Sequence, residues 1–338
     1  MQTILVTGGA GFIGSHLIRA LIREGKSRVI NLDLMTYAGD LTRLSDIEKN
    51  PAYNFVRGDI RDENSLNRLF SEHNIDCVIH CAAESHVDRG FRNPILFYSV
   101  NVLGTLALLE TARQHWGKNS AGIKRFLNVS TDEVYGDALF GDYFTEDAPL
   151  RPNHPYAASK AAGDLLVLSY VKTYGFPGLI TRSTNTFGPA QHPEKLVPHV
   201  INAIHEDRSP QIHGDGEQLR DWLYVDDHCD AILRVLRRDR IGEIYNVAAN
   251  EEHSVLEIAA LIREELTATA IAPEHIADRL FQDRRFLISA EKIKAELAWK
   301  PEHNFRDALY QTVKSYEEFK FRSPKSVVGF QSEILSNI

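Results

Sequence analysis

The sequence predicts an α/β protein: a doubly wound parallel sheet followed by a smaller α/β lobe. Short β-branched runs alternate with longer amphipathic stretches through the first half of the chain. A glycine-rich turn joins the first such run to the first amphipathic stretch, and the alternation weakens after about residue 184. These three observations decide the fold class before any single residue is considered.

The first half of the chain supplies six predicted strands and four predicted helices. The strands are expected at 3–7, 28–33, 53–59, 76–83, 125–131 and 178–184. The helices are expected at 12–24, 62–73, 94–115 and 156–174. Strands that alternate with helices imply a parallel sheet covered on both faces, which binds its ligands at the carboxyl ends of its strands.

The second half predicts a smaller unit that winds back onto the first. Helices are expected near 196–206, 226–238, 254–266 and 304–319, and strand-like pieces at 221–225 and 243–248. We therefore expect one domain at 1–184, an interleaved second lobe at 185–320, and a C-terminal tail at 321–338.

Composition excludes several classes of protein. The net charge of -8 provides no basic surface for nucleic acid or an anionic membrane, and no apolar segment approaches the roughly 20 residues of a membrane span. The three cysteines, Cys77, Cys81 and Cys229, fit neither a zinc site nor a disulfide framework. We expect a cytoplasmic protein without a metal, and we interpret His80, Cys81 and His86 as part of a strand and the loop after it.

The glycine-rich turn predicts a dinucleotide site. The stretch "LVTGGAGFIGSHL" has G-x-G-x-x-G spacing and ends at Gly14, with Gly8 and Gly11 before it, so the backbone can approach a pyrophosphate. Asp33 ends the next strand, 19 residues after Gly14, where an acid accepts hydrogen bonds from a ribose and repels a 2′-phosphate. This favours NAD over NADP in a Rossmann-type domain. Further cofactor contacts are expected at Phe12, Ile13, Asp59, Ile60 and Ala82.

Two short stretches carry the predicted chemistry. In "YAASK", Tyr156 and Lys160 lie one helical turn apart, and we expect the ammonium to lower the pKa of the phenol so that it can accept a proton from an alcohol. In "STDEVYGD", Asp132 and Glu133 follow a strand directly, where the turning chain can present both carboxyls to one substrate.

Together with Ser130, Thr131 and Asp33, these motifs resemble the extended short-chain dehydrogenase/reductase family over the chain to about residue 320. The resemblance implies that Tyr156 is the base, that Lys160 binds the nicotinamide ribose and supports the tyrosine, and that the Thr131 hydroxyl positions the substrate hydroxyl. NAD is the implied cofactor. Members of this family commonly dimerise through two helices, here near 94–115 and 156–174, so we expect a homodimer.

Within that family, four stretches are similar to enzymes that remove water from dTDP-glucose: "AAESHVDRG", "STDEVYGD", "NTFGPAQHPEKLVP" and "RDWLYVDDH". The resemblance implies oxidation at C4, elimination of water across C5 and C6, and return of the hydride to C6. Glu133 would remove the C5 proton and Asp132 would protonate the departing hydroxyl. An acid in that role needs a raised pKa, from burial or from the charge of its neighbour.

The sugar-nucleotide end agrees less well with the family pattern. The resemblance implies substrate contacts from eight residues: Ser85, His86, Asn185, Glu194, Lys195, Arg220, Asn250 and Arg279. Four positions depart from the pattern: Thr186, Gln211, His213 and Gln282. The base and the exact sugar therefore stay open, and a UDP-sugar 4,6-dehydratase is an alternative. A C4 epimerase would have no use for the two carboxyls, and a non-enzymatic NAD-binding scaffold would have none for Thr131, Tyr156 and Lys160.

Overall fold

The structure is a computed structural model that describes residues 1–117, 123–138, 143–268 and 270–322. The predicted tail at 321–338 lies outside the described residues from position 323 onward.

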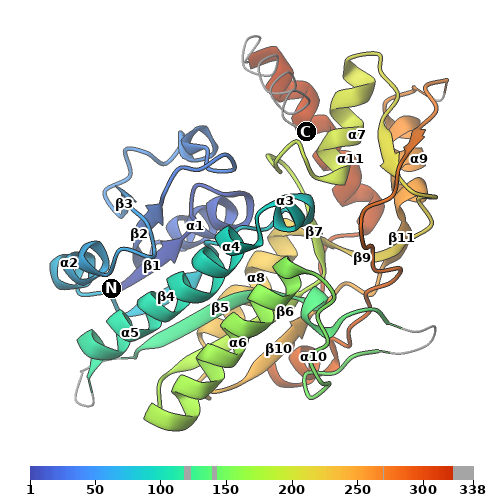
Figure 1. Ribbon diagram of the computed structural model, residues 1–338. Helices are drawn as coiled ribbons and strands as arrows, with labels where there is room; N and C mark the ends of the chain where they lie inside the picture. The colour runs from blue at the N-terminus through green and yellow to red at the C-terminus, as the bar shows by residue number, and fades with distance from the viewer. Residues whose placement is uncertain (118–122, 139–142, 269, 323–338) are drawn as a thin grey trace.

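A seven-stranded parallel sheet forms the centre of the molecule, with strand order β10-β6-β5-β4-β1-β2-β3 (Figure 1). All six strands predicted in the first half are present, and the doubly wound α/β fold is confirmed. The seventh strand, β10, comes from the second half of the chain. The strands are β1 (Gln2–Thr7), β2 (Ser27–Asp33), β3 (Tyr53–Arg57), β4 (Cys77–His80), β5 (Arg125–Thr131), β6 (Gly178–Ser183) and β10 (Ile244–Val247).

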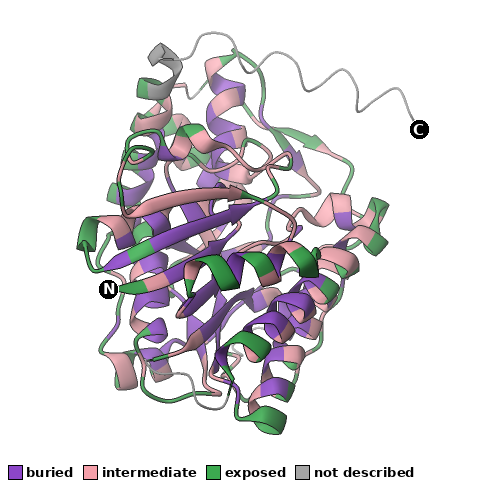
Figure 2. Ribbon diagram, turned by 90° about the vertical axis from the view of Figure 1, so that its left-hand side faces the viewer, coloured by how far each residue is buried: buried purple, intermediate pink, exposed green. Residues whose placement is uncertain are grey.

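Helices cover both faces of this sheet because successive strand residues point to opposite sides. In β1, Ile4 and Val6 join one apolar cluster while Leu5 joins another. The first cluster packs under α1 (Phe12–Glu24), α8 (Val225–Leu236) and α10 (Glu291–Leu297); the second packs under α2 (Glu63–His73), α5 (Thr105–Trp116) and α6 (Pro155–Tyr174). Figure 2 shows the buried strands between the two helical layers.

The predicted helix at 94–115 is present but interrupted. It consists of α4 (Pro94–Tyr98), the π-helical turn η2 (Ser99–Gly104) and α5, and the short helix α3 (Val87–Arg92) precedes it. Within the π turn, the buried Asn101 side chain holds the backbone of Glu84: its Oδ1 accepts from the Glu84 N–H at 2.8 Å and its Nδ2 donates to the Glu84 carbonyl at 2.9 Å. The turn thus joins this helix to the loop after β4.

One expectation from composition was wrong. The stretch Pro94–Trp116 is long and apolar enough, by length and composition, to cross a membrane. Half of its most apolar window is buried inside the protein, as in the core helix of a globular fold.

The smaller lobe gathers around a third apolar cluster that includes Phe187, Trp222 and Phe305. Its strands are β7 (Asn185–Phe187), β8 (Gln211–His213), β9 (Leu219–Tyr224), β11 (Glu252–Ser254) and β12 (Glu274–Ile276), in two small sheets of order β11-β9-β7 and β12-β8. Its helices are α7 (Leu196–His205), α9 (Val255–Glu265) and α11 (Phe305–Arg322). The single-turn helices η1 (Leu41–Leu44) and η3 (Asp132–Tyr135) complete the described elements.

The two lobes are interleaved in the chain. Residues 185–224 build part of the small lobe, α8 and β10 then return to the large sheet, and α9 returns to the small lobe. Four of the strands that the sequence did not predict have only three residues each, which is too short for an alternating pattern to emerge.

Candidate active site

A cavity of about 600 Å³ opens where the carboxyl ends of the large sheet face the small lobe. Residues from both lobes line it, so a ligand inside would contact the glycine turn and the small lobe together. Most of the predicted site residues line this cavity: Gly8, Gly11, Phe12, Ile13, Gly14, Asp33, Asp59, Ile60, Ala82, Ser85, Thr131, Asp132, Glu133, Tyr156, Lys160, Asn185, Glu194 and Lys195.

The glycine turn leaves room at the start of α1. Gly8 has a left-handed φ of 68°, and a Cβ there would lie 2.8 Å from the Ala82 backbone. A Cβ on Gly14 would lie 2.3 Å from the carbonyl oxygen of Gly8. No side chain caps α1, whose N-cap is Gly11, so its first amide groups and its positive dipole end are available to an anion. The turn therefore fits a pyrophosphate.

The carboxylate of Asp33 lies at the end of β2, beside the glycine turn. One oxygen accepts from the Ala10 N–H at 3.0 Å and the other from the Met35 N–H at 2.8 Å. These two bonds orient the carboxylate while each oxygen keeps a further lone pair for a ribose hydroxyl. At the end of β3, Asp59 is paired with Arg61, whose Nη2 lies 2.6 Å from it, so that guanidinium is already engaged.

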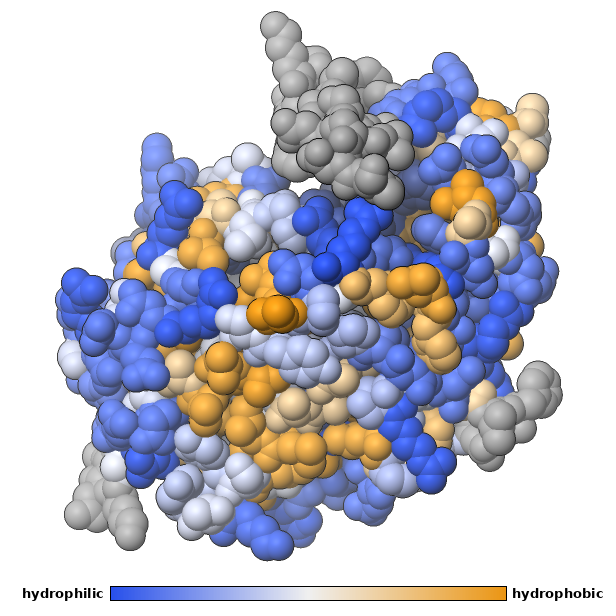
Figure 3. Space-filling model, in the orientation of Figure 1, coloured by the Kyte–Doolittle hydropathy of each residue, from blue (hydrophilic) through white to orange (hydrophobic). Residues whose placement is uncertain are grey.

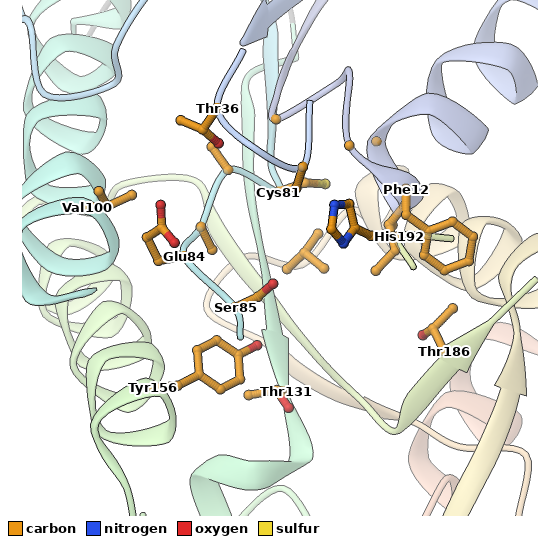
Figure 4. A pocket seen from close by; sticks show the side chains of 18 of the residues that line it. Phe12, Thr36, Cys81, Glu84, Ser85, Val100, Thr131, Tyr156, Thr186 and His192 are labelled. Atoms are coloured by element: carbon orange, nitrogen blue, oxygen red, sulfur yellow. The ribbon is translucent and has the colours of Figure 1, made fainter. Parts of the chain in front are cut away.

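Helix α6 begins at the catalytic end of the cavity and carries both Tyr156 and Lys160. The Lys160 ammonium is buried and donates to the Val129 carbonyl of β5 at 2.7 Å, so the lysine is tied to the strand that ends at Thr131. Figure 4 shows the Tyr156 hydroxyl pointing toward Thr131 and Ser85. A secondary alcohol in this space would meet two hydroxyl groups at once.

The expectation that Lys160 lowers the pKa of Tyr156 was wrong for the protein without bound ligands. Burial raises the pKa of Tyr156 well above its ordinary value, and the charges of Glu133 and Asp132 raise it further. The hydrogen bond with Thr131 acts in the opposite direction but does not outweigh them. The lysine ammonium is engaged with a strand carbonyl, and two carboxyls face the phenol.

Asp132 and Glu133 share one helical turn but have different environments. Asp132 is 2% exposed, and burial followed by the charge of Glu133 raises its pKa well above the ordinary value, as predicted for the acid. Its Oδ1 accepts from the Thr131 hydroxyl at 3.2 Å, while its Oδ2 has no protein partner. The free oxygen is the one that could donate a proton to a ligand.

Burial also opposes ionisation of Glu133, but favourable contacts outweigh it. A hydrogen bond from His154, with the positive charges of Lys195 and Arg220 nearby, holds the pKa of Glu133 below its ordinary value. The Nε2 of His154 lies 3.0 Å from Glu133 Oε2. Two neighbouring carboxyls with pKa values pushed in opposite directions are the arrangement expected of an acid and a base.

Basic side chains gather around Glu194 in the wall that the small lobe contributes to the cavity. The Nε of Arg89 lies 3.4 Å from its carboxylate, and the rings of His86 and His192 lie 3.7 and 3.5 Å away. Lys195 is the N-cap residue of α7, and its ammonium donates to the Ser85 carbonyl at 3.3 Å. These contacts connect the small lobe to the loop after β4.

Four of the predicted substrate residues do not line the cavity itself. The His86 ring lies 3.7 Å from Glu194. Arg220 is buried near the charges of Asp132 and Glu133 and donates to the Asp283 carbonyl at 2.8 Å. Arg279 is paired with Asp88 at 3.0 Å. Asn250 is exposed and its amide is directed to the Ile288 carbonyl at 3.3 Å.

Sequence reasoning missed several residues of the cavity. Tyr37 and His192 meet at its rim with their rings edge to face, and Arg89 lies 3.7 Å over the Tyr37 ring. Glu84 lies within the stretch "AAESHVDRG" but was not among the predicted site residues. Figure 4 shows its side chain in the cavity. His154 is the N-cap residue of α6 and lies two positions before the predicted helix start at residue 156. No local pattern marks Tyr37, because its partners come from distant segments.

Thr186, one of the departures from the family pattern, lines the cavity and pairs its hydroxyl with His228 Nδ1 at 2.9 Å. The imidazole of His213 is directed to the Ala277 carbonyl at 2.9 Å. Among the described residues, no group of three or more His, Cys, Asp and Glu side chains is arranged to hold a metal ion.

Comparisons with known proteins agree with this geometry. The family model described as GDP-mannose 4,6 dehydratase matches residues 5–312. A dTDP-glucose 4,6-dehydratase from Xanthomonas campestris pv. campestris is 45% identical over 328 residues, which span 94% of this chain and 93% of that protein. The enzyme of the same name from Haemophilus influenzae is 44% identical and matches 94% of this chain and 98% of its own length.

Solved structures of nucleotide-sugar enzymes also resemble this chain. The dTDP-glucose 4,6-dehydratase of Streptomyces venezuelae, crystallised with NAD and dTDP bound, superimposes with a TM-score of 0.90 at 40% identity and covers 95% of this chain and 98% of its own. A UDP-glucose 4-epimerase of Thermotoga maritima also superimposes, with a TM-score of 0.85 at 29% identity over 94% and 99% of the two chains. The chain thus belongs to the extended short-chain dehydrogenase/reductases and, within them, to the dTDP-glucose 4,6-dehydratase family.

Proposed function

We propose that this protein is an NAD-dependent hydro-lyase that converts dTDP-glucose to dTDP-4-keto-6-deoxyglucose. The carrying observation is the pair Asp132 and Glu133, whose pKa values are pushed apart beside Tyr156 at the end of β5. Relatives of that name at 41–45% identity over most of the chain support the same reaction.

The residues of the first lobe fit NAD. Gly8 and Gly14 leave the space that a pyrophosphate needs, the uncapped start of α1 offers amide groups, and Asp33 faces the place of the adenosine ribose. When bound, NAD⁺ accepts a hydride from C4 of the sugar and gives it back at C6. Lys160 stands where it can hold the nicotinamide ribose.

Oxidation needs a base for the C4 hydroxyl. Tyr156 takes that proton, and Thr131 orients the hydroxyl by hydrogen bonding. Because burial and two carboxyls raise the pKa of Tyr156, the phenolate has to be favoured by positive charge within the assembled complex.

Elimination uses the two carboxyls. The C4 ketone acidifies the C5 hydrogen, Glu133 removes that proton, and Asp132 donates its own proton to the C6 hydroxyl, which leaves as water. Glu133 then returns a proton to C5 as the hydride reaches C6. Adjacent residues at a strand end can reach the adjacent carbons C5 and C6, which explains why the two carboxyls are neighbours in the sequence.

We infer that residues 185–320 hold the sugar nucleotide. Asn185 and Lys195 line the cavity, and Arg220 and Arg279 lie just behind its wall, where they can meet a diphosphate after modest side-chain movement. Glu194 and Asn250 of the same lobe, with Ser85 and His86 from the segment after β4 in the first lobe, complete the proposed set. The exposed side chain of Asn250 is the member with the least support from the structure.

The test is to incubate the purified protein separately with dTDP-glucose, UDP-glucose and UDP-N-acetylglucosamine, and to follow loss of water by mass spectrometry. We expect dTDP-glucose to show by far the highest kcat/KM. Preference for a UDP sugar would show that the base site is built differently around the same acid and base. Epimerisation without loss of water would overturn the proposed reaction.

We propose that the enzyme works as a homodimer in the cytoplasm. Ile95, Leu103 and Leu165 are large apolar side chains that are 57–80% exposed on α4, η2 and α6. Figure 3 shows hydrophobic residues gathered on this face, over the position of α5 and α6 in Figure 1. Such a patch is typical of a subunit interface. Cys77, Cys81 and Cys229 are free thiols, which suits a reducing compartment.

Light scattering coupled to size-exclusion chromatography tests the dimer. We expect a mass close to twice 38.2 kDa for the parent protein. The double variant Ile95→Asp, Leu165→Asp should shift the mass to that of one chain. A monomeric parent protein would contradict this proposal and leave the proposed reaction untouched.

A further inference from the structure

His154 stands at a point where three parts of the active site meet. It is the N-cap residue of α6, is 6% exposed, and lies two residues before Tyr156. Its ring stacks with the Tyr156 ring at an interplanar angle of 15° and packs edge-on against Phe91 of α3. The ring is thus held in place from two sides.

The two ring nitrogens of His154 have different partners. Nδ1 accepts a hydrogen bond from the Ala157 N–H at 3.3 Å, as an N-cap side chain does. A nitrogen that accepts carries no proton, so the proton of the neutral imidazole is on Nε2. Nε2 lies 3.0 Å from Glu133 Oε2, and this hydrogen bond therefore runs from the imidazole to the carboxylate.

Asp283 provides a second carboxylate at the same nitrogen. It is 3% exposed, its Oδ2 lies 3.7 Å from His154 Nε2, and its Oδ1 accepts from the Asn153 amide at 2.6 Å. Arg220 donates to the Asp283 carbonyl at 2.8 Å, so this segment is anchored under the cavity. At 3.7 Å the Asp283 oxygen is beyond hydrogen-bond distance of Nε2, whereas the Glu133 oxygen at 3.0 Å is within it, so Nε2 donates to Glu133.

We propose that His154 is a positioning residue for the elimination step: it orients the Glu133 carboxylate toward C5 and keeps it ionised through the hydrogen bond from Nε2. This inference rests on the proposed function of Glu133. One helix start then serves both halves of the reaction, because Tyr156 acts in the oxidation while His154 prepares the base for the elimination.

Removing this bond should change the protonation of Glu133 in a known direction. Glu133 is faced by charged and titratable groups from several elements: Asp132 on its own turn, His154 and Tyr156 at the start of α6, Lys195 before α7, Arg220 of β9, and Asp283. Burial favours the protonated form, and the hydrogen bond from His154 is the largest contact that opposes it. Without it, the pKa of Glu133 rises and the base is protonated at higher pH.

The test compares three replacements of His154. In His154→Ser and His154→Asn the new side chain can still cap α6 but is too short to reach Glu133, whereas His154→Gln keeps a donor on a longer side chain. For the first two we expect kcat with dTDP-glucose to fall on the order of 10- to 100-fold, with KM changed less than about twofold. The acid limb of the kcat profile should move up by about one pH unit. His154→Gln should recover part of the rate.

Two measurements separate elimination from oxidation. With dTDP-glucose deuterated at C5, the isotope effect on kcat should increase in His154→Ser, because proton removal has become slower. With dTDP-6-deoxyglucose, which has no C6 hydroxyl to lose, formation of NADH at 340 nm should proceed at the parent rate. The matched control is Ser254→Ala, which removes the capping box of α9 and should lower Tm without moving the acid limb.

The inference is overturned if His154→Ser lowers kcat with no shift of the acid limb and no larger C5 isotope effect, since a merely structural role would give that result. It is also overturned if the variant turns over like the parent enzyme. A parent enzyme that fails to dehydrate dTDP-glucose would instead contradict the proposed function, so the two failures are distinct.

Discussion

The two ends of the cavity are built in different ways. At the cofactor end the binding surface is formed by the backbone of the glycine turn and of the uncapped start of α1, together with the Asp33 carboxylate, which two backbone amides hold. At the catalytic end it consists of buried side chains that act on one another's charge. We assign binding to the first end, where the described residues present backbone amides and a carboxylate that is held by two of them. The second obtains its reactivity from contacts among segments distant in sequence.

The strongest test of this comparison is Glu133→Gln. The amide keeps the shape of the side chain but cannot accept the C5 proton, so dehydration should fall by about 10²- to 10⁴-fold. Formation of NADH in a single turnover should remain measurable, because we assign the oxidation to Tyr156. The control is Glu291→Gln on α10. The Glu291 side chain is 76% exposed, and its replacement should leave the rate of dehydration unchanged. Unchanged turnover of Glu133→Gln would remove Glu133 from the mechanism.

The pH profile tests whether the two carboxyls act as acid and base. In the proposed elimination Glu133 acts in its ionised form, and its pKa is lowered, so kcat should rise with pH through a limb below the ordinary range of glutamate. Asp132 must be protonated and its pKa is raised, so kcat should fall on the alkaline side as Asp132 loses its proton. In Asp132→Asn the alkaline limb should disappear together with most of the rate. A parent profile that shows neither limb, when it is measured from below the ordinary pKa of glutamate up to pH 9, would contradict these assignments.

At the cofactor end, Gly14→Ala should affect binding and leave the chemistry intact. The added Cβ would come within 2.3 Å of a backbone oxygen, so the turn has to shift away from the pyrophosphate. NAD should bind at least about tenfold more weakly by calorimetry, a loss of about 1.4 kcal/mol. At saturating NAD, kcat should stay close to the parent value. Gly163→Ala in α6, where a Cβ meets only ordinary contacts, is the matched control.

The smallest expected effect belongs to Asp33→Asn. The amide can still meet one of the two backbone donors, so the loop should keep its shape while one hydrogen bond and the negative charge are lost. NAD affinity should fall about three- to tenfold. The ratio of NADP to NAD affinity should rise, since a 2′-phosphate is no longer repelled. An unchanged ratio would show that Asp33 does not set the cofactor preference.

The same contrast explains what could be predicted from the sequence. The glycine turn and Asp33 are a local pattern with one structural meaning, and the structure places both in the cavity. The raised pKa of Asp132 was also predictable, because two adjacent carboxyls at a buried strand end repel each other. The wrong prediction for Tyr156 arose from considering Lys160 alone. The burial of Tyr156 and the two carboxyls that face it raise its pKa. Both depend on how β5 and α6 pack, and the spacing of residues along the chain does not reveal that packing.

Residues whose role depends on distant partners were the ones missed. His154 has its main partners at positions 133 and 283, and Tyr37 meets Arg89 and His192. Nothing within a window of ten residues connects these groups. Short strands such as β7 and β12 escaped prediction for a related reason, since they form by pairing with a neighbour and not through their own alternation.

The position of β10 in the sheet affects how the protein can be made. This edge strand, residues 244–247, pairs with β6 across some sixty positions of chain, so a ribosome must synthesise nearly three quarters of the protein before the sheet is complete. Until then, the buried strand β6 presents an unpaired apolar edge, which is a template for association with other chains. Truncation at the apparent end of the first lobe would make that transient edge permanent. The enzyme therefore has to be expressed and engineered as one unit, although its chemistry divides into two halves.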